Sequence, residues 1–125
     1  MPDQRDWDAI RALARELTEP IQPFLSDEVR ALIRTTAQDV AISPTDTASA
    51  LMNDASAAAL VKEIAGRLSN GSRRLSRTIT ELRERRSAGD LDGARQLLKE
   101  VLAVEVVPHY QDIVHAYLEV LEDEP

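Results

Sequence analysis

The chain has 125 residues, of which 43% are hydrophobic, and a formal net charge of −7. It contains no cysteine, which excludes disulfides, thiolate metal sites and thiol nucleophiles, and its acidity argues against generic binding to nucleic acids or anionic membranes. With four glycines and six prolines among abundant Ala, Leu, Arg and Glu, the composition predicts a single all-α domain over residues 1–125.

Residues 1–54 are expected to form three short helices. Each is preceded by a residue of a type that caps helix N-termini, namely Asp6, Ser26 and Ser43. Pro44 strengthens the third signal, because proline fits the first position of a helix. Apolar residues follow the first two caps at three-and-four spacing, so these helices each have one face for the core.

Residues 55–125 are expected to form a long antiparallel hairpin of two helices, at about 57–87 and 91–122. Apolar residues recur at helical spacing through both segments. Between them, the sequence SAGD at 87–90 offers a glycine to end one helix and an aspartate to cap the next. The three N-terminal helices would pack across the apolar side of this hairpin.

The stretch VLAVEVVPHY at 101–110 places a carboxylate and a proline inside the most apolar part of the chain. Its four valines favour a strand, but no other segment alternates with period two, so a strand here would have no partner. A proline inside a helix removes one backbone bond and clashes with the preceding turn. The second helix of the hairpin is therefore predicted to kink near Pro108.

An ion pair between the two long helices follows from their register. If the chain reverses near Gly89, position i lies opposite about position 178 − i, which places Glu105 near Arg73 and Arg74, and the kink near Asn70 and Gly71. Of the two arginines, Arg74 lies at the edge of the apolar stripe of its helix. A charge-assisted pair between Arg74 and Glu105 is then geometrically available. The simplest interpretation is a structural pin, for which Glu105→Leu would preserve the fold and raise its stability. The alternatives are a carboxylate that reaches solvent at the helix edge, or a catalytic carboxylate.

Glu105, His109 and Asp112 would share one helix face and could supply metal ligands. His115 would lie on another side of the helix, and the sequence has no HExxH, GxSxG, P-loop or GxGxxG motif. We therefore expect His109 to be a surface or boundary residue and the protein not to be an enzyme. No catalytic, cofactor-binding or metal-binding residue is assigned, and a metal-assisted enzyme around Glu105 and His109 is kept as an alternative.

Basic residues concentrate between residues 67 and 86, which contain seven arginines and two acidic residues. Arg67, Arg73, Arg77 and Arg85 form the candidate interaction surface. The simplest interpretation is a solvated helix face that pairs with its own glutamates and with the acidic segment that follows. A surface for DNA or for an acidic partner is the alternative.

Five segments of the chain, in this order, resemble the DUSAM domain, a bacterial set of small paralogous proteins of unknown function. These segments are WDAIRALAREL, VRALIRTTAQDVAIS, LVKEIAGRLSNGSRRL, AGDLDGARQLLKEVLAVEVVPHY and YLEVLE. The resemblance covers nearly the whole chain and implies no activity, cofactor or catalytic residue. It also implies that His109 stands where the family more often has an aromatic residue.

We expect a cytoplasmic, non-enzymatic protein that binds another protein through helix faces, in a regulatory, adaptor or immunity-type role. The polar N-terminal segment and the lack of a long apolar run argue against export and against a membrane partner. A two-helix hairpin leaves part of its apolar stripe uncovered, so a homodimer through the hairpin is a further expectation. A nucleic-acid accessory role for the arginine-rich helix 67–86 is the first alternative.

Overall fold

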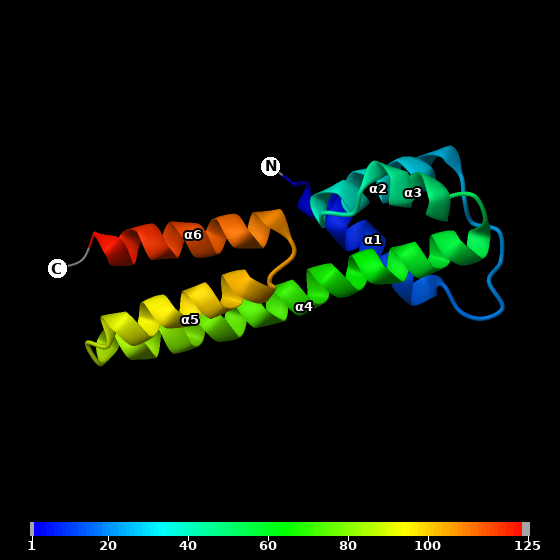
Figure 1. The fold of residues 1–125 in the computed structure, drawn as a ribbon. Helices are drawn as coiled ribbons and strands as arrows, with labels where there is room; N and C mark the ends of the chain where they lie inside the picture. The colour runs from blue at the N-terminus through cyan, green and yellow to red at the C-terminus, as the bar shows by residue number, and fades with distance from the viewer. Residues whose placement is uncertain (1, 124–125) are drawn as a thin grey trace. The chain divides into compact units, whose positions relative to one another are not determined.

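The computed structural model describes residues 2–123 of the chain. These residues form six α-helices and no strand, which confirms the all-α prediction. In chain order the helices are α1 (Gln4–Glu16), α2 (Asp27–Asp39), α3 (Pro44–Ala50), α4 (Asp54–Ser87), α5 (Leu91–Val104) and α6 (Pro108–Glu122) (Figure 1).

The helices separate into two compact units, Met1–Leu68 and Ser69–Pro125. The boundary falls inside α4, which contributes its first half to one unit and its second half to the other. From the sequence, a division of the chain was expected near residue 55, at the start of this long helix. The apolar stripe of α4 continues through both halves, so periodicity gives no sign of where its packing partners change.

Short polar side chains cap the helices of the first unit. Ser26 and Ser43 each accept a hydrogen bond of 3.1 Å from the backbone N–H three residues later, as predicted. The first helix begins earlier than predicted, because Asp3 is its cap and accepts from the N–H of Arg5 at 2.8 Å. Asp6 lies in the first turn instead, where a negative charge interacts favourably with the helix dipole.

The core of the first unit is formed by α1, α2 and the first half of α4. The buried apolar side chains from these helices and from the C-cap of α2 are Trp7, Ile10, Ile33, Ala37, Val40, Ala57, Ala58, Leu60, Val61, Ile64 and Leu68. The indole N–H of Trp7 donates to a carboxylate oxygen of Asp39 at 3.0 Å. The guanidinium of Arg67 donates to the carbonyl of Val40 at 2.8 Å, which satisfies an acceptor at the C-terminal end of α2.

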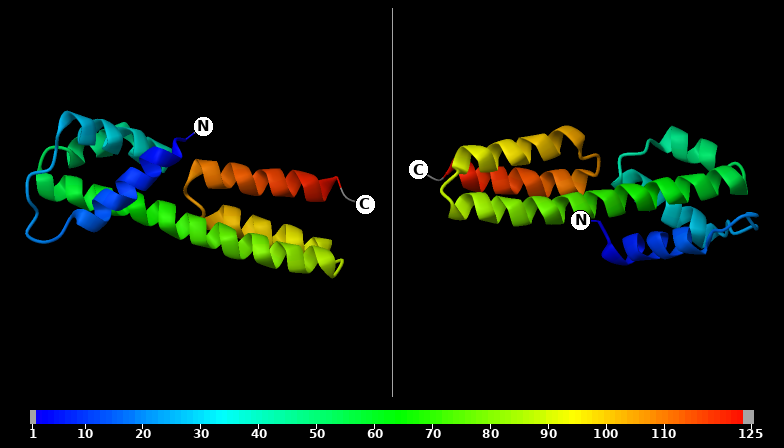
Figure 2. Two further views of the ribbon diagram at one scale, coloured as in Figure 1. Left: turned by 180° about the vertical axis from the view of Figure 1, so that it is seen from behind. Right: turned by 90° about the horizontal axis from the view of Figure 1, so that it is seen from below.

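A tight turn joins α4 to α5. Gly89 has a φ of 77°, in the left-handed region that glycine adopts without strain. The N–H groups of Gly89 and Asp90 donate back to carbonyls in the last turn of α4, at 3.0 and 2.8 Å. Asp90 then caps α5 by accepting from the N–H of Gly93 at 2.9 Å. The chain therefore reverses, and α5 runs back alongside the second half of α4 (Figures 1 and 2).

The helix breaks completely before Pro108 instead of kinking. Residues 105–107 lie in neither α5 nor α6. After this break α6 runs antiparallel to α5 (Figure 2), and the guanidinium of Arg95 near the start of α5 donates to the carbonyl of Leu121 near the end of α6 at 2.9 Å. The prediction of one kinked helix over residues 91–122 is therefore corrected to two antiparallel helices.

Burial of the apolar stripe of α6 explains the reversal. The shared core of the second unit is Leu82, Ala94, Leu98, Val101, Val114, Leu118 and Leu121. If the helix continued past a kink, the three core residues of α6 would point away from those of α4 and α5. Burial of each Leu or Val side chain stabilises the fold by about 1.5–3 kcal/mol, so the reversed arrangement is favoured. The expectation of a homodimer rested on an apolar stripe that a two-helix hairpin leaves uncovered. In the second unit α6 covers this stripe, so the stripe itself does not require a second copy of the chain.

Gly71 allows α6 to approach α4 closely. A Cβ atom at position 71 would lie 2.5 Å from Cδ2 of Tyr110 and 3.0 Å from Oε1 of Glu105. Tyr110 is only 6% exposed, so its ring has little room to move away. This contact explains why a glycine interrupts the apolar stripe of α4, where a larger side chain would otherwise be expected.

We predict opposite effects for alanine at the two glycines of α4. Gly71→Ala should lower the free energy of unfolding by about 1–3 kcal/mol, because the added methyl group overpacks the contact with Tyr110. Gly66→Ala is the matched control: nothing lies within 4 Å of its added Cβ, so better helix propensity should raise stability by up to about 1 kcal/mol. Urea denaturation followed by circular dichroism measures both. A Gly71→Ala protein as stable as the parent chain would contradict the close approach.

Candidate functional site

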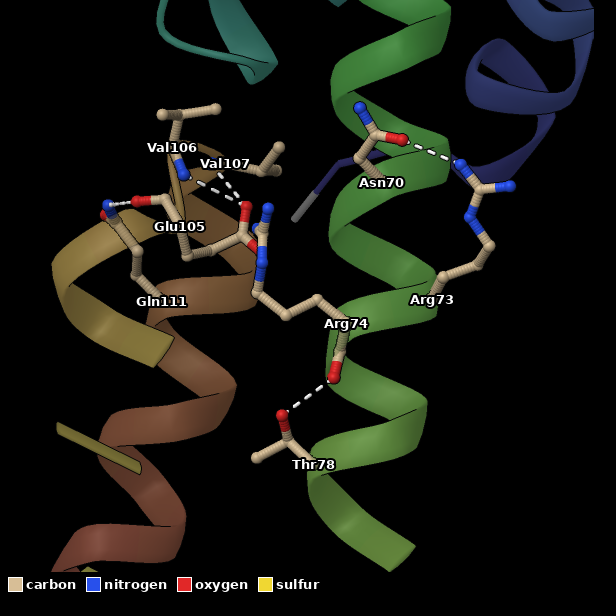
Figure 3. Close-up of polar contacts among 8 residues, drawn as sticks. All are labelled: Asn70, Arg73, Arg74, Thr78, Glu105, Val106, Val107 and Gln111. Atoms are coloured by element: carbon tan, nitrogen blue, oxygen red, sulfur yellow. Dashed lines mark hydrogen bonds and ion pairs between the residues drawn. The ribbon is translucent and has the colours of Figure 1, made fainter. Parts of the chain in front are cut away.

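A buried carboxylate lies at the junction of α5 and α6. The side chain of Glu105 is 1% exposed, and its Oε1 accepts a hydrogen bond from Nη1 of Arg74 at 2.9 Å. Its Oε2 accepts from the backbone N–H groups of Val106 and Val107, at 3.0 and 3.1 Å. Figure 3 shows Arg74 reaching from α4 to this carboxylate. The structure thus brings together the two residues for which the sequence register suggested an ion pair.

The backbone around Pro108 explains why an acceptor is needed here. Because proline has no N–H and disfavours a helical residue before it, Val107 is extended, with φ −87° and ψ 115°. The N–H groups of Val106 and Val107 consequently have no helical acceptor, and α6 has no side-chain cap. Glu105 supplies the acceptor for both groups. Gln111, at the end of the first turn of α6, donates its amide to the carbonyl of Glu105 at 2.7 Å and closes the junction.

Glu105 does more than fix the register of α4 and α5, because it also accepts hydrogen bonds from the backbone of residues 106 and 107. Arg74 keeps 29% of its side chain exposed, so its charge retains some hydration when the carboxylate is removed. The two backbone N–H groups lose their acceptor, and removal of one partner from a buried pair costs about 3–5 kcal/mol. From these contacts we predict that Glu105→Leu lowers stability instead of raising it, because a leucine side chain cannot accept the two backbone hydrogen bonds.

The structure does not assemble the metal site considered from the sequence. Glu105 lies before α6, so it does not share a helix face with His109 and Asp112. His109 is half-buried beside the ring of Tyr110, with ring centroids 6.1 Å apart, and His115 is exposed. Within residues 2–123, no group of three or more His, Asp or Glu side chains is placed to hold a metal ion.

Three of the four arginines proposed as an interaction surface have polar partners on their own helix, and two of these three, Arg67 and Arg73, lie in different units. Arg67 belongs to the first unit, where it pairs with Glu63 at 3.0 Å in addition to its bond to α2. Arg73 belongs to the second unit and donates to the side-chain oxygen of Asn70 at 2.7 Å (Figure 3). The side chain of Asn70 is neutral, so this hydrogen bond does not compensate the positive charge of the exposed guanidinium.

The other two arginines of the proposed surface differ from each other. Arg85 pairs with Glu81 at 2.9 Å and with Asp90 at 3.3 Å. The hydrogen bond to Glu81 is the main cause that raises the pKa of Arg85. Arg77 is exposed, and its side chain makes no hydrogen bond or ion pair with residues 2–123. The arginine-rich segment is thus largely occupied by contacts within the chain.

Two exposed valines, which were not predicted from the sequence, flank the buried carboxylate. Val104 is 57% exposed at the end of α5, and Val106 is 44% exposed in the connection to α6. Side chains alternate along an extended segment, so Glu105 and Val107 point inward while Val106 points outward. We call Val104 and Val106 together the valine projection. The sequence contained one signal for their exposure. Both valines lie close to Pro108, which ends the helix, so the helical apolar stripe does not require them to be buried.

The family model described as protein of unknown function (DUF2379) matches residues 5–121. The chain belongs to this family. No curated protein and no solved structure matches the chain. In this DUF2379 protein the matched range includes helices of both units, the pair of Arg74 and Glu105, and the valine projection. No helix within the described residues combines the length and the apolar character needed to cross a membrane.

We predict a measurable coupling energy between Arg74 and Glu105. A double-mutant cycle with Arg74→Met and Glu105→Gln, read by urea denaturation, should give a coupling of about 1–3 kcal/mol, because the carboxylate is desolvated. Glu105→Gln alone should be the more damaging single change, since it weakens the acceptor for two backbone N–H groups as well as the ion pair.

The matched control is the pair of Glu63 and Arg67 on the same helix. Its side chains are 58% and 30% exposed, so solvent screens the interaction and the same cycle should give only about 0.3–0.5 kcal/mol. Equal coupling in the two pairs would show that burial of Glu105 adds nothing to its interaction with Arg74.

Proposed function

We propose that this protein is a non-enzymatic helical protein-interaction module whose binding surface is the valine projection. Single exposed apolar side chains are normal on protein surfaces. Here two valines, 57% and 44% exposed, stand within three residues of each other on a hydrogen-bonded connection. This preformed apolar contact is the observation that supports the proposal.

The Glu105 carboxylate makes the valine projection suitable for binding. Ordering one residue of a flexible loop costs about 1–2 kcal/mol of conformational free energy when a partner binds. The backbone of Val106 is already held by its hydrogen bond to Glu105, and Val104 is fixed as the last residue of α5. A partner would therefore meet side chains that are already ordered, so more of the contact energy would appear as affinity.

Charge near the valine projection indicates the chemistry of the partner. Exposed Glu100 lies one turn before Val104 in α5, and exposed Asp112 lies one turn into α6. Residues 87–125 carry nine acidic and two basic residues, so this part of the chain repels phosphates. The partner that fits is a protein with a small apolar pocket rimmed by Lys or Arg, rather than a nucleic acid.

The same proposal extends to the biological setting. The quoted sequence segments are similar to the DUSAM domain, so we place the chain among these bacterial paralogues, acting in the cytoplasm as a regulatory, adaptor or immunity-type protein. A set of small paralogues built on one scaffold suits recognition of different partners by different surface residues. A second copy of the chain is the rival partner for the valine projection.

A double substitution in the valine projection should abolish partner binding. Proteins captured from the native cells by a tagged chain are compared for the parent, Val104→Ser with Val106→Ser, and Val120→Ser. Loss of the two apolar contacts should reduce capture of the true partner by at least about tenfold. Val120 is the matched control. It is similarly exposed, at 49%, but it lies near the C-terminal end of α6 and is far in sequence from the junction of α5 and α6.

The proposal is contradicted if the double variant captures the same proteins in the same amounts as the parent chain. Sedimentation of the purified proteins tests the rival partner. A parent dimer that the double variant dissociates would assign the valine projection to self-association instead.

Charge reversal beside the valine projection should slow association with the captured partner. Glu100→Lys with Asp112→Lys should lower the association rate and weaken its dependence on salt, because attraction to a basic rim is lost. Glu119→Lys, an exposed acid beside Val120, is the control. Unchanged association rates for the double variant at low ionic strength would rule out a basic rim on the partner.

A further inference from the structure

A cleft of about 230 Å³ lies in the first unit, where α2 and the connection to α3 meet α3. Its lining residues are Arg34, Gln38, Ile42, Pro44, Thr47 and Ala48. The volume corresponds to about eight water molecules at roughly 30 Å³ each. The cleft can therefore hold a molecule of a few heavy atoms, although not a nucleotide or a peptide.

Two donor side chains line one wall of this cleft. Arg34 and Gln38 are four residues apart on α2, so they lie on the same face of the helix, one turn from each other. Both are exposed, and neither side chain makes a hydrogen bond or ion pair with residues 2–123. Arg34 is the only charged residue in the lining. The wall thus presents a positive group with two-pronged donor geometry and a neutral amide donor.

The opposite wall offers no side-chain donor that is free to bind an anion. Ile42, Pro44 and Ala48 present apolar surface. Thr47 is buried, and its hydroxyl already donates to the carbonyl of Ser43 at 2.9 Å. A ligand that fills the cleft therefore needs one anionic end for the α2 wall and an apolar body for the α3 wall.

We propose that this cleft binds a small aliphatic monocarboxylate. The carboxylate accepts two parallel hydrogen bonds from the guanidinium of Arg34 and a third from the amide of Gln38, and the hydrocarbon chain covers Ile42, Pro44 and Ala48. Its size limits the ligand to about four to six carbon atoms at the volume given above. This site lies in the first unit and does not rest on the valine projection.

The test is a titration of the ¹⁵N-labelled protein with butyrate, followed by amide chemical shifts at constant pH and ionic strength. Saturable shifts should be confined to amides between residues 34 and 48, with a dissociation constant on the order of millimolar for so small a ligand. Butyramide has the same shape without the charge, and it should bind at least about tenfold more weakly.

A substitution at Arg34 separates this site from nonspecific anion binding. Arg34→Gln should weaken butyrate binding at least about tenfold, while its other amide shifts stay at parent values because Arg34 makes no contact that the fold needs. Arg73→Gln, at an exposed arginine in the second unit, should leave the affinity unchanged. The proposal is overturned by shifts that do not saturate, by equal binding of butyramide, or by an Arg34→Gln protein that binds as the parent does.

Discussion

The hydrogen bonds of one carboxylate hold the second unit in its observed form. Pro108 stops α5 from continuing, and the chain must then pass through three residues that belong to no helix. Two of these residues present backbone N–H groups that have no helical acceptor, and both donate to Glu105. The same carboxylate contacts Arg74 on α4, so one side chain links the end of α5, the start of α6 and the middle of α4.

Local signals predicted the starts of α2, α3 and α5 correctly. Ser26, Ser43 and Asp90 are the caps that the sequence indicated, because capping depends on residues within one turn. The register that placed Glu105 near Arg73 and Arg74 depends only on the turn at Gly89 and on α5, both of which precede the break, and the apolar stripe of α4 then favoured Arg74. The pair could therefore be located from the sequence although the path of the chain after it was predicted wrongly.

The reversal of α6 could not be predicted from the same signals. A kinked helix and a broken one both start from a proline and a rotated apolar stripe, and the choice between them depends on which arrangement buries α6 against α4 and α5. The exposure of Val104 and Val106 follows from that tertiary choice. The division of α4 between two units is equally hidden, because each half presents the same helical periodicity to a different set of partners.

A buried ion pair adds little net stability, and its clearest effect is to specify one arrangement among several. In this protein the specified arrangement is the path of residues 105–107, which carries an exposed valine outward beside a second one at the end of α5. The valine projection proposed for binding thus depends on the hydrogen bonds that Glu105 accepts from the backbone of residues 106 and 107. The DUF2379 family model spans both features, although no residue role is assigned through that match.

Native-state hydrogen exchange of the amides of Val106 and Val107 tests this dependence most directly. Both lie outside helices, and an unpaired loop amide exchanges rapidly. If the Glu105 carboxylate holds them as described, they exchange within roughly one order of magnitude of the buried helical amides of Leu98 and Val101. Exchange of both amides at the rate of an exposed, unstructured peptide would contradict the account.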